Sequence, residues 1–118
     1  MAAKIVEQWF NIMVWTIPKL GKFPRDQRFL LADKVQTLMC DVLEDLLYSS
    51  YASKENAVKK LKECNLKLEK LRYYIRLCKE LKYVSVKGYH YFVKRINEVG
   101  QMIGGWIKYK DESKKAES

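Results

Sequence analysis

The sequence predicts an all-α fold, an antiparallel up-down-up-down four-helix bundle, and three observations support this prediction. Only two prolines and five glycines interrupt the 118 residues, so long uninterrupted elements are expected. Leu, Lys and Glu, which favour helix over strand, are abundant. Four segments carry apolar residues at helical spacing and are joined by short connections, which makes successive helices antiparallel. One domain is expected over residues 1–110, followed by a disordered polar tail over residues 111–118.

The first predicted helix runs from about Ala3 to Ile17 and is expected to end at Pro18 and Gly21. Its apolar residues form two adjacent stripes, which are Ile5, Trp9, Ile12 and Thr16, and Val6, Phe10, Met13 and Ile17. Val14 and Trp15 add apolar surface on further faces, more than one neighbouring layer would cover. We therefore expect Trp9 and Trp15 to take part in contacts with another subunit.

The second predicted helix begins near Pro24, which suits a first helical turn, and Asp26, which suits the positive end of the helix dipole. It is expected to end at about Tyr51. Its core stripe comprises Leu31, Val35, Leu38, Val42 and Leu46, widened by Phe29, Met39 and Leu43. The break that follows is short, so this helix and the next form an αα-hairpin with Ser53 as the N-cap.

The third predicted helix has the most regular pattern, a heptad seam in which apolar residues alternate four-residue and three-residue steps. The seam consists of Ala57, Leu61, Cys64, Leu68, Leu71, Ile75 and Cys78. Leu66, Tyr73 and Leu77 fall roughly on the opposite side of the helix, where a lone bundle would leave them in water. These three residues are therefore a candidate oligomer surface.

The fourth predicted helix follows a turn at residues 82–85, with Ser85 as a possible N-cap. Its seam is predicted at Tyr89, Val93, Ile96, Gly100, Ile103 and Ile107, with Phe92, Val99 and Trp106 beside it. Gly100, Gly104 and Gly105 lower intrinsic helix stability, so a close approach of a neighbouring helix is the expected reason for them.

The sequence contains few of the residues and motifs from which catalytic sites are built. His90 is the single histidine, and no HExxH, GxSxG, P-loop or glycine-rich phosphate motif occurs. Solvated faces and salt bridges to neighbouring lysines are expected to account for the acids Asp41, Glu44 and Asp45. We therefore expect no catalytic residue, metal, cofactor or small-molecule substrate.

The compartment is predicted from the cysteines and from the apolar runs. Cys40, Cys64 and Cys78 form no metal motif, and their odd number argues against a disulfide framework. Reduced thiols in the cytoplasm are the expectation. The apolar segment from Trp9 to Ile17 is interrupted by Asn11 and lacks a cleavage site, and no run reaches the ~18 apolar residues of a spanning helix. No export signal or membrane association is expected.

The charge points to polyanions as partners. The chain has 23 Lys and Arg against 14 Asp and Glu, a formal net charge of +9. On the third helix, Lys59, Lys62, Lys70 and Arg76 project away from the seam, and Lys60, Lys67, Arg72 and Lys79 flank it. Arg25, Arg28, Lys94 and Arg95 extend this basic set. The alternative is that these residues only solubilise a helical surface. The imbalance favours salt-sensitive binding of RNA or DNA with little sequence selectivity.

Three segments together resemble a known family. They are Phe-Pro-Arg-Asp-Gln-Arg-Phe at residues 23–29, Leu-Glu-Lys-Leu-Arg-Tyr-Tyr-Ile-Arg-Leu at residues 68–77, and Ile-Gly-Gly-Trp-Ile-Lys at residues 103–108. The ordered set is similar to the accessory variability determinants (Avd) of diversity-generating retroelements, which are related to four-helix bacterial proteins encoded in ribosomal RNA intervening sequences. The resemblance covers about residues 5–108.

The resemblance implies a homopentamer of four-helix bundles that forms a basic barrel. It further implies association with the retroelement's reverse transcriptase and with nucleic acid during mutagenic copying of a template RNA, without catalysis by the accessory protein itself. Arg25, Arg28, Arg72 and Arg76 lie in the matching segments and are the residues it favours for phosphate or partner contact. Structural salt bridges are the alternative for Arg25 and Arg28.

Two other classes of function stay open. A basic adaptor of the intervening-sequence protein family would bind protein partners only, and would bind no nucleic acid even at low salt. An enzyme would carry a bound metal or cofactor, for which the sequence offers no site.

Overall fold

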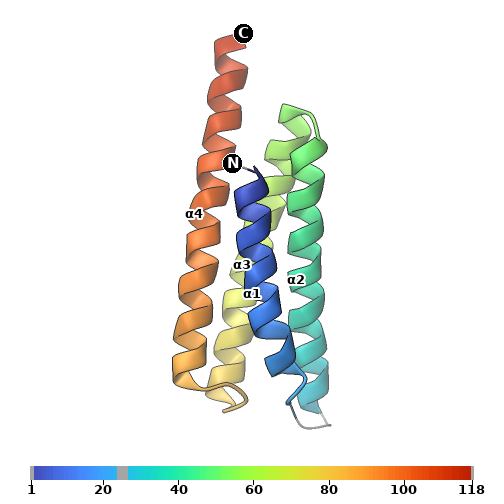
Figure 1. Cartoon of the computed structure of the whole chain (residues 1–118), viewed down its shortest axis with the longest axis vertical. Coiled ribbons are helices and arrows are strands. Elements are labelled where there is room, and N and C mark those ends of the chain that lie inside the picture. The colour runs from blue at the N-terminus through green and yellow to red at the C-terminus, as the bar shows by residue number, and fades with distance from the viewer. Residues whose placement is uncertain (1, 24–26, 118) are drawn as a thin grey trace.

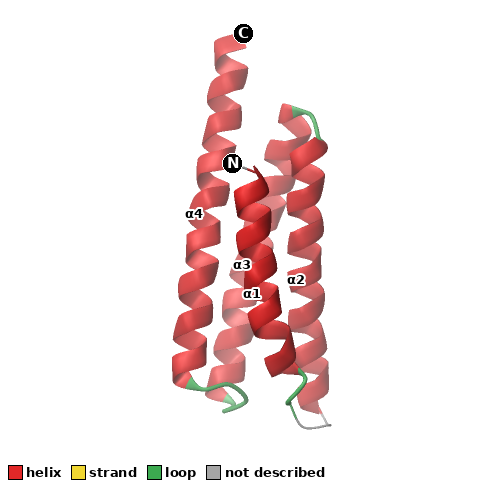
Figure 2. Ribbon diagram, viewed as in Figure 1, coloured by secondary structure: helices red, strands yellow, loops and turns green. Residues whose placement is uncertain are grey.

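The computed structural model describes the backbone of residues 2–23 and 27–117, and within these residues it is all-helical. The helices are α1 (Ala2–Leu20), α2 (Gln27–Tyr51), α3 (Lys54–Glu80) and α4 (Val86–Glu117) (Figures 1 and 2). Each helix packs against two others, α2 against α1 and α3, and α4 against α3 and α1. The predicted antiparallel four-helix bundle is confirmed.

The buried face of α3 coincides with the predicted heptad seam. Its buried residues are Ala57, Leu61, Cys64, Leu68, Leu71, Ile75 and Cys78, each one a predicted seam position. This agreement has a simple cause, because α3 packs between α2 and α4 and needs a strict alternation of four and three residues to keep one stripe facing both.

The face that α1 buries includes Trp9, which corrects the prediction that this residue lies at a subunit contact. Trp9 is 0% exposed between Ile5 and Ile12 on the buried stripe. Its indole Nε1 donates a hydrogen bond of 3.0 Å to the backbone carbonyl of Met39 on α2. The only polar atom of the side chain is thereby satisfied inside the core, as a buried tryptophan requires.

The end of α1 lies three residues beyond the predicted boundary, since the helix continues through Pro18 to Leu20. A proline in the last turn removes only one helical hydrogen bond. The burial of Leu20, which is 4% exposed, supports the additional turn.

The core stripe of α2 differs from the prediction at its first turn. Val35, Leu38, Val42 and Leu46 are buried as predicted, together with Met39. Phe29, which was expected to widen the stripe, is instead 61% exposed. Phe29 lies in the first turn of the helix.

The seam of α4 is rotated relative to the prediction. Ile96 and Ile103 are buried as predicted, and the three residues predicted to flank the seam, Phe92, Val99 and Trp106, are buried between and beside them. Tyr89, Val93, Gly100 and Ile107, predicted in the seam, are only partly buried. Both registers have a seven-residue period, and periodicity alone leaves the choice open. The partners decide it, because α4 faces both α1 and α3.

The glycines of α4 differ in their surroundings. A Cβ at Gly100 would lie 3.2 Å from Arg72 Nη2 and 3.8 Å from Leu68 Cδ1, so the expected close approach to a neighbouring helix exists there. At Gly104 and Gly105 a Cβ would meet nothing within 4 Å. Within the bundle, the prediction of close helix contact is therefore wrong for this pair.

The connections after α2 and α3 have defined caps. Ser53 Oγ accepts a hydrogen bond from the backbone N–H of Asn56, and Ser85 Oγ accepts one from Gly88, so both predicted N-caps are confirmed. At the end of α3, Lys82 adopts a φ of 65°. The backbone N–H groups of Tyr83 and Lys82 donate to the carbonyls of Cys78 and Lys79, the two bonds of a Schellman motif.

Beyond the core, α4 continues to Glu117 and projects past the ends of the other helices (Figure 1). A disordered tail was expected from Asp111. The segment after Gly105 contains no proline or glycine and carries several Lys and Glu residues, which favour continuation of a helix without tertiary contacts.

Candidate nucleic-acid interface

The outward face of α3 carries four exposed cationic side chains, Lys59, Lys62, Lys70 and Arg76. These are the residues predicted to project away from the seam. Within the described part of the chain they form no hydrogen bond or ion pair, so their charges are available to an external anion. We call these four residues the free cation set.

The cations that flank the seam are instead engaged with neighbouring groups. Lys60 lies 3.1 Å from Glu63 and 5.2 Å from the ring centroid of Tyr48. Their hydrogen bond and mutual attraction raise the pKa of Lys60 and lower that of Glu63. Lys79 lies 3.2 Å from Glu80 and 4.6 Å from the ring centroid of Tyr89 on α4. A phosphate would have to compete with these contacts.

Lys67 forms the shortest ion pair among the flanking cations. Its Nζ lies 2.6 Å from Asp45 Oδ2 on α2 and donates a hydrogen bond to it. The expected salt bridge to a lysine is therefore present at Asp45. The expectation of a solvated face is wrong for this residue, which is only 7% exposed. Asp45 lies on the same side of α2 as the core residues Val42 and Leu46, and the partner lysine allows this burial.

Arg72 links α3 to α4. Its Nε donates a hydrogen bond of 2.9 Å to Asn97 Oδ1, and its Nη1 donates one of 2.9 Å to Glu69 Oε2. The absence of a side chain at Gly100 leaves room for the third nitrogen, Nη2. The planar guanidinium thus serves as a tether between the two helices.

The remaining predicted cations lie off α3. Lys94 is exposed on α4, while Arg95 forms an ion pair of 3.2 Å with Glu98 and its buried Nε has no hydrogen-bond partner. Arg25 lies outside the described residues. Arg28 lies in the first turn of α2, and its side chain also lies outside the described part.

The predicted oligomer residues of α3 lie on the same face as the free cation set. Leu66, Tyr73 and Leu77 are 58%, 62% and 44% exposed. Helical periodicity interleaves them with Lys62, Lys70 and Arg76. The result is a mixed face of cationic, aromatic and aliphatic side chains.

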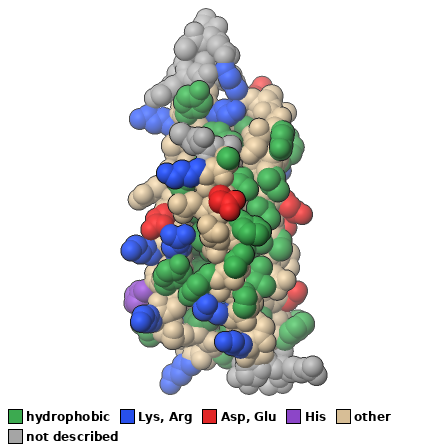
Figure 3. Space-filling model, viewed as in Figure 1, with side chains coloured by type: hydrophobic (Ala, Val, Ile, Leu, Met, Phe, Trp, Pro, Cys, Tyr) green, Lys and Arg blue, Asp and Glu red, His purple; other side chains and the backbone are tan. Residues whose placement is uncertain are grey.

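The opposite side of the molecule has a different character. Figure 3 views the bundle from the side of α1, and Lys and Arg side chains gather over α4 while apolar side chains lie over α1 and α2. On α1, Phe10 is 48% and Val14 is 58% exposed. Trp15, the other predicted interface residue, is partly buried and stacks on Tyr91 of α4 at a centroid distance of 4.4 Å.

Cys64 and Cys78 have the properties of core residues and not those of reactive thiols. Burial raises the pKa of Cys64 to about 12 and that of Cys78 to about 11. Both side chains are therefore protonated at neutral pH and poorly nucleophilic.

The described residues contain neither a cluster suited to a metal ion nor a helix that could span a membrane. No group of three or more His, Cys, Asp or Glu side chains there is arranged to hold a metal ion. In the same part of the chain, no helix combines the length and apolar character that crossing a membrane requires.

Two features of the structure were not predicted from the sequence. The Asp45–Lys67 pair joins residues 22 positions apart on different helices, so no local pattern indicates it. The same holds for a pocket of about 230 Å³ near the end of α1, whose lining comes from α1, α3, α4 and the turns that follow α1 and α3.

Comparison with known protein families agrees with this architecture. A model described as bAvd-like matches residues 4–110, nearly the whole bundle. The chain belongs to the bAvd-like family. Membership suggests an accessory role in a diversity-generating retroelement, and accessory proteins of this family are generally non-catalytic. No match was found among curated proteins.

Proposed function

We propose that this protein is a non-catalytic accessory of a diversity-generating retroelement, acting in the cytoplasm. It binds the element's reverse transcriptase together with the template RNA or its cDNA and supports mutagenic retrohoming. Membership of the bAvd-like family supports the proposed role in a retroelement. The free cation set carries the nucleic-acid part.

Binding through the free cation set follows from its chemistry. Four cations on one helix face, without partners in the described chain, offer favourable sites for backbone phosphates and release counterions on binding. Phosphate contacts of this kind carry little sequence information. Tyr73, 62% exposed among these cations, offers a ring on which an unpaired base can stack.

In this proposal the protein positions the template and takes no part in the chemical reaction. It holds the template near the polymerase, and nucleotide addition belongs to the reverse transcriptase. We propose further that the active form is a homopentamer, in which the basic faces of several copies act on one RNA. Repetition of weak phosphate contacts raises the overall affinity without any new contact.

A second function is favoured by one observation. Leu66 and Leu77 lie on the same face as the cations and suit a protein partner better than RNA. An adaptor that binds only proteins would use the whole mixed face of α3 for that partner.

One experiment separates the two functions. The protein is analysed by size-exclusion chromatography with light scattering, alone and with the reverse transcriptase of the same retroelement and its template RNA, at low and moderate salt. A complex that contains enzyme and RNA is expected. Binding of neither component at low salt would contradict the proposal, and binding of the enzyme without RNA would favour the adaptor.

A further inference from the structure

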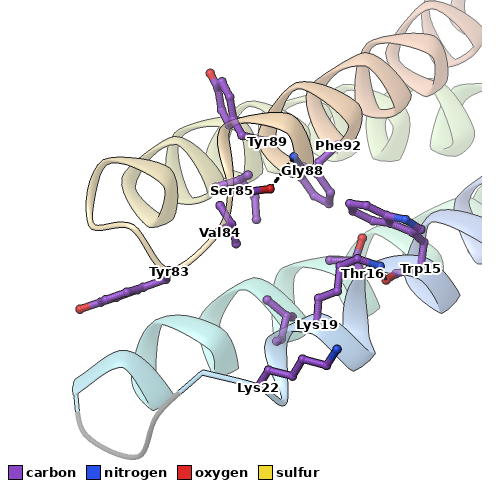
Figure 4. A pocket seen from close by; sticks show the side chains of 12 residues that line it. Trp15, Thr16, Lys19, Lys22, Tyr83, Val84, Ser85, Gly88, Tyr89 and Phe92 are labelled. Carbon is purple, nitrogen blue, oxygen red and sulfur yellow. Dashed lines mark hydrogen bonds between the residues drawn. The ribbon is translucent and has the colours of Figure 1, made fainter.

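A pocket opens at one end of the bundle, between the last turns of α1 and the start of α4 (Figure 4). Its volume is about 230 Å³. α1 contributes Trp15, Thr16 and Lys19 on one side, and Gly88 and Phe92 of α4 lie on the other. The turn between α3 and α4 adds Tyr83, Val84 and Ser85.

Thr16 supplies an unused hydrogen-bonding group in this pocket. The residue is only 3% exposed, and its Oγ1, which is closed to solvent, has no hydrogen-bond partner among the described residues. A threonine inside a helix often bonds back to a preceding carbonyl, and this one does not. A buried hydroxyl without a partner destabilises the protein, by about 1–3 kcal/mol. A ligand with a hydroxyl group would remove that cost.

The walls of the pocket favour an aromatic group. Trp15, Tyr89 and Phe92 line it, and Ile75 adds aliphatic surface from α3. Aromatic side chains pair favourably with one another, and Trp15 already packs against Tyr91 in a tilted arrangement with an interplanar angle of 44°.

The charge at the pocket is positive. Lys19 and Lys22 are exposed lining residues, and among the described residues no acidic side chain lines the pocket. Lys19 Nζ donates a hydrogen bond of 3.0 Å to the Trp15 carbonyl and lies 3.8 Å from the Trp15 ring centroid. The side chain of Lys22 forms no ion pair or hydrogen bond within the described part of the chain, so its charge is available.

The volume limits the size of the occupant. Sites for drug-sized ligands and cofactors measure roughly 300–1,000 Å³, so a pocket of about 230 Å³ matches one large side chain better than a cofactor. We propose that this pocket receives a tyrosine side chain from a protein partner, in a segment that also carries carboxylates. The ring packs between the aromatic walls, the phenol bonds to Thr16 Oγ1, and the carboxylates face Lys19 and Lys22. This site is independent of the free cation set.

The first test uses 4-methylphenol, the isolated tyrosine side chain, with toluene as the control that lacks the hydroxyl. The protein is labelled with 5-fluorotryptophan, and the three ¹⁹F signals are assigned with Trp15→Phe. The Trp15 signal is expected to move saturably, while those of Trp9 and Trp106, which are 0% and 3% exposed, stay in place. A hydrogen bond to Thr16 predicts roughly three- to tenfold tighter binding of 4-methylphenol than of toluene.

Thr16→Val keeps the shape of the side chain and removes its hydroxyl. This variant is expected to be at least as stable as the native protein, because an unsatisfied buried group is removed. It should bind 4-methylphenol and toluene with less than about a twofold difference, which is too small for a hydrogen bond. A Trp15 signal that does not move, or equal binding of both probes by the native protein, would overturn the proposal. So would a Trp15 signal that moves on dilution without a probe, because a second copy of the chain would then fill the pocket.

The peptides acetyl-Glu-Tyr-Glu-amide and acetyl-Lys-Tyr-Lys-amide test the charged part. The acidic peptide is expected to shift the Trp15 signal at lower concentration, and Lys22→Gln should reduce its advantage. Equal binding of the two peptides at low salt would contradict a partner segment with carboxylates.

Discussion

The Asp45 carboxylate on α2 and the Lys67 ammonium on α3 lie 2.6 Å apart, with Asp45 only 7% exposed. This pair divides the basic residues of α3 by role. Lysines that point outward have their charge available for a ligand, whereas Lys67 uses its charge to keep a carboxylate inside the bundle.

Lys67→Met is therefore expected to destabilise the fold. The substitution leaves the charge of Asp45 buried and unpaired, and breaking such a pair costs about 3 kcal/mol. Chemical denaturation monitored by circular dichroism measures the change. Lys62→Met, on the outward face of the same helix, is the matched control and should change the free energy of unfolding by less than about 0.5 kcal/mol. Equal effects of the two substitutions would refute the distinction. The double variant Asp45→Leu with Lys67→Met should recover most of the lost stability.

Lys82→Gly is expected to stabilise the protein. Lys82 has a φ of 65°, a conformation that costs a residue with a Cβ about 1 kcal/mol and costs glycine almost nothing. The free energy of unfolding should rise by about that amount. Lys82→Ala removes the same charge and keeps the Cβ, so it should give no such increase. A gain of equal size with alanine would point to charge and not to backbone conformation.

The Cys64 thiol predicts a loss of stability at alkaline pH. Its pKa is about 12 in the folded protein because of burial, against an ordinary value of 9.0. Below pH 9 the thiol is protonated in both the folded and the unfolded protein, so its full contribution to stability is present. Above pH 9 the unfolded thiol ionises first, so stability falls by up to about 1.4 kcal/mol per pH unit.

The contribution of Cys64 is isolated by comparison with Cys64→Ala. The difference in unfolding free energy between the native protein and this variant should be constant from pH 7 to 8.5 and should decrease from pH 9 to 10.5. A difference that stays constant over the whole range would contradict the assignment.

Leu66 and Leu77 lie on the same face of α3 as the free cation set, so a subunit contact there would compete with RNA for this face. The double variant Leu66→Gln with Leu77→Gln tests whether the face joins subunits. These side chains are 58% and 44% exposed, so the bundle itself should keep its stability. The mass measured by light scattering is expected to fall if this face joins subunits. Leu30→Gln with Val86→Gln, at residues 68% and 60% exposed, controls for the loss of apolar surface and should leave the mass unchanged. An unchanged mass for the first pair would remove these residues from the contact.

Much of the fold follows from local pattern. The seven buried residues of α3 and the caps at Ser53 and Ser85 depend on spacing and on residue type within a few positions, which the sequence displays directly. The seam of α4 and the burial of Trp9 and Asp45 depend on which neighbour each helix faces. A one-helix pattern contains no such information, so these features required the tertiary structure.

The candidate site shows the same division. Periodicity separates the cations that point away from the seam, Lys59, Lys62, Lys70 and Arg76, from those that flank it. It does not reveal that the flanking Lys67 and Arg72 contact side chains on α2 and α4. Hence the sequence indicated the basic face, and the structure reduced it to the free cation set.

The central claim is that the free cation set binds nucleic acid, and the salt dependence of RNA binding tests it most directly. Binding of single-stranded template RNA is measured by fluorescence anisotropy at salt concentrations from about 50 to about 200 mM. Over this range, binding through phosphate contacts weakens strongly. The variant with Lys62→Gln, Lys70→Gln and Arg76→Gln is compared with Lys4→Gln, Lys34→Gln and Lys87→Gln. Each variant lowers the formal net charge of +9 by three.

The first variant is expected to lose affinity and to reduce the slope of log K against log salt by about 2, since each phosphate contact with a single strand contributes about 0.7. The second should lose much less. Equal losses in both variants would mean that only the net charge matters, and the account of a defined basic face on α3 would then be wrong.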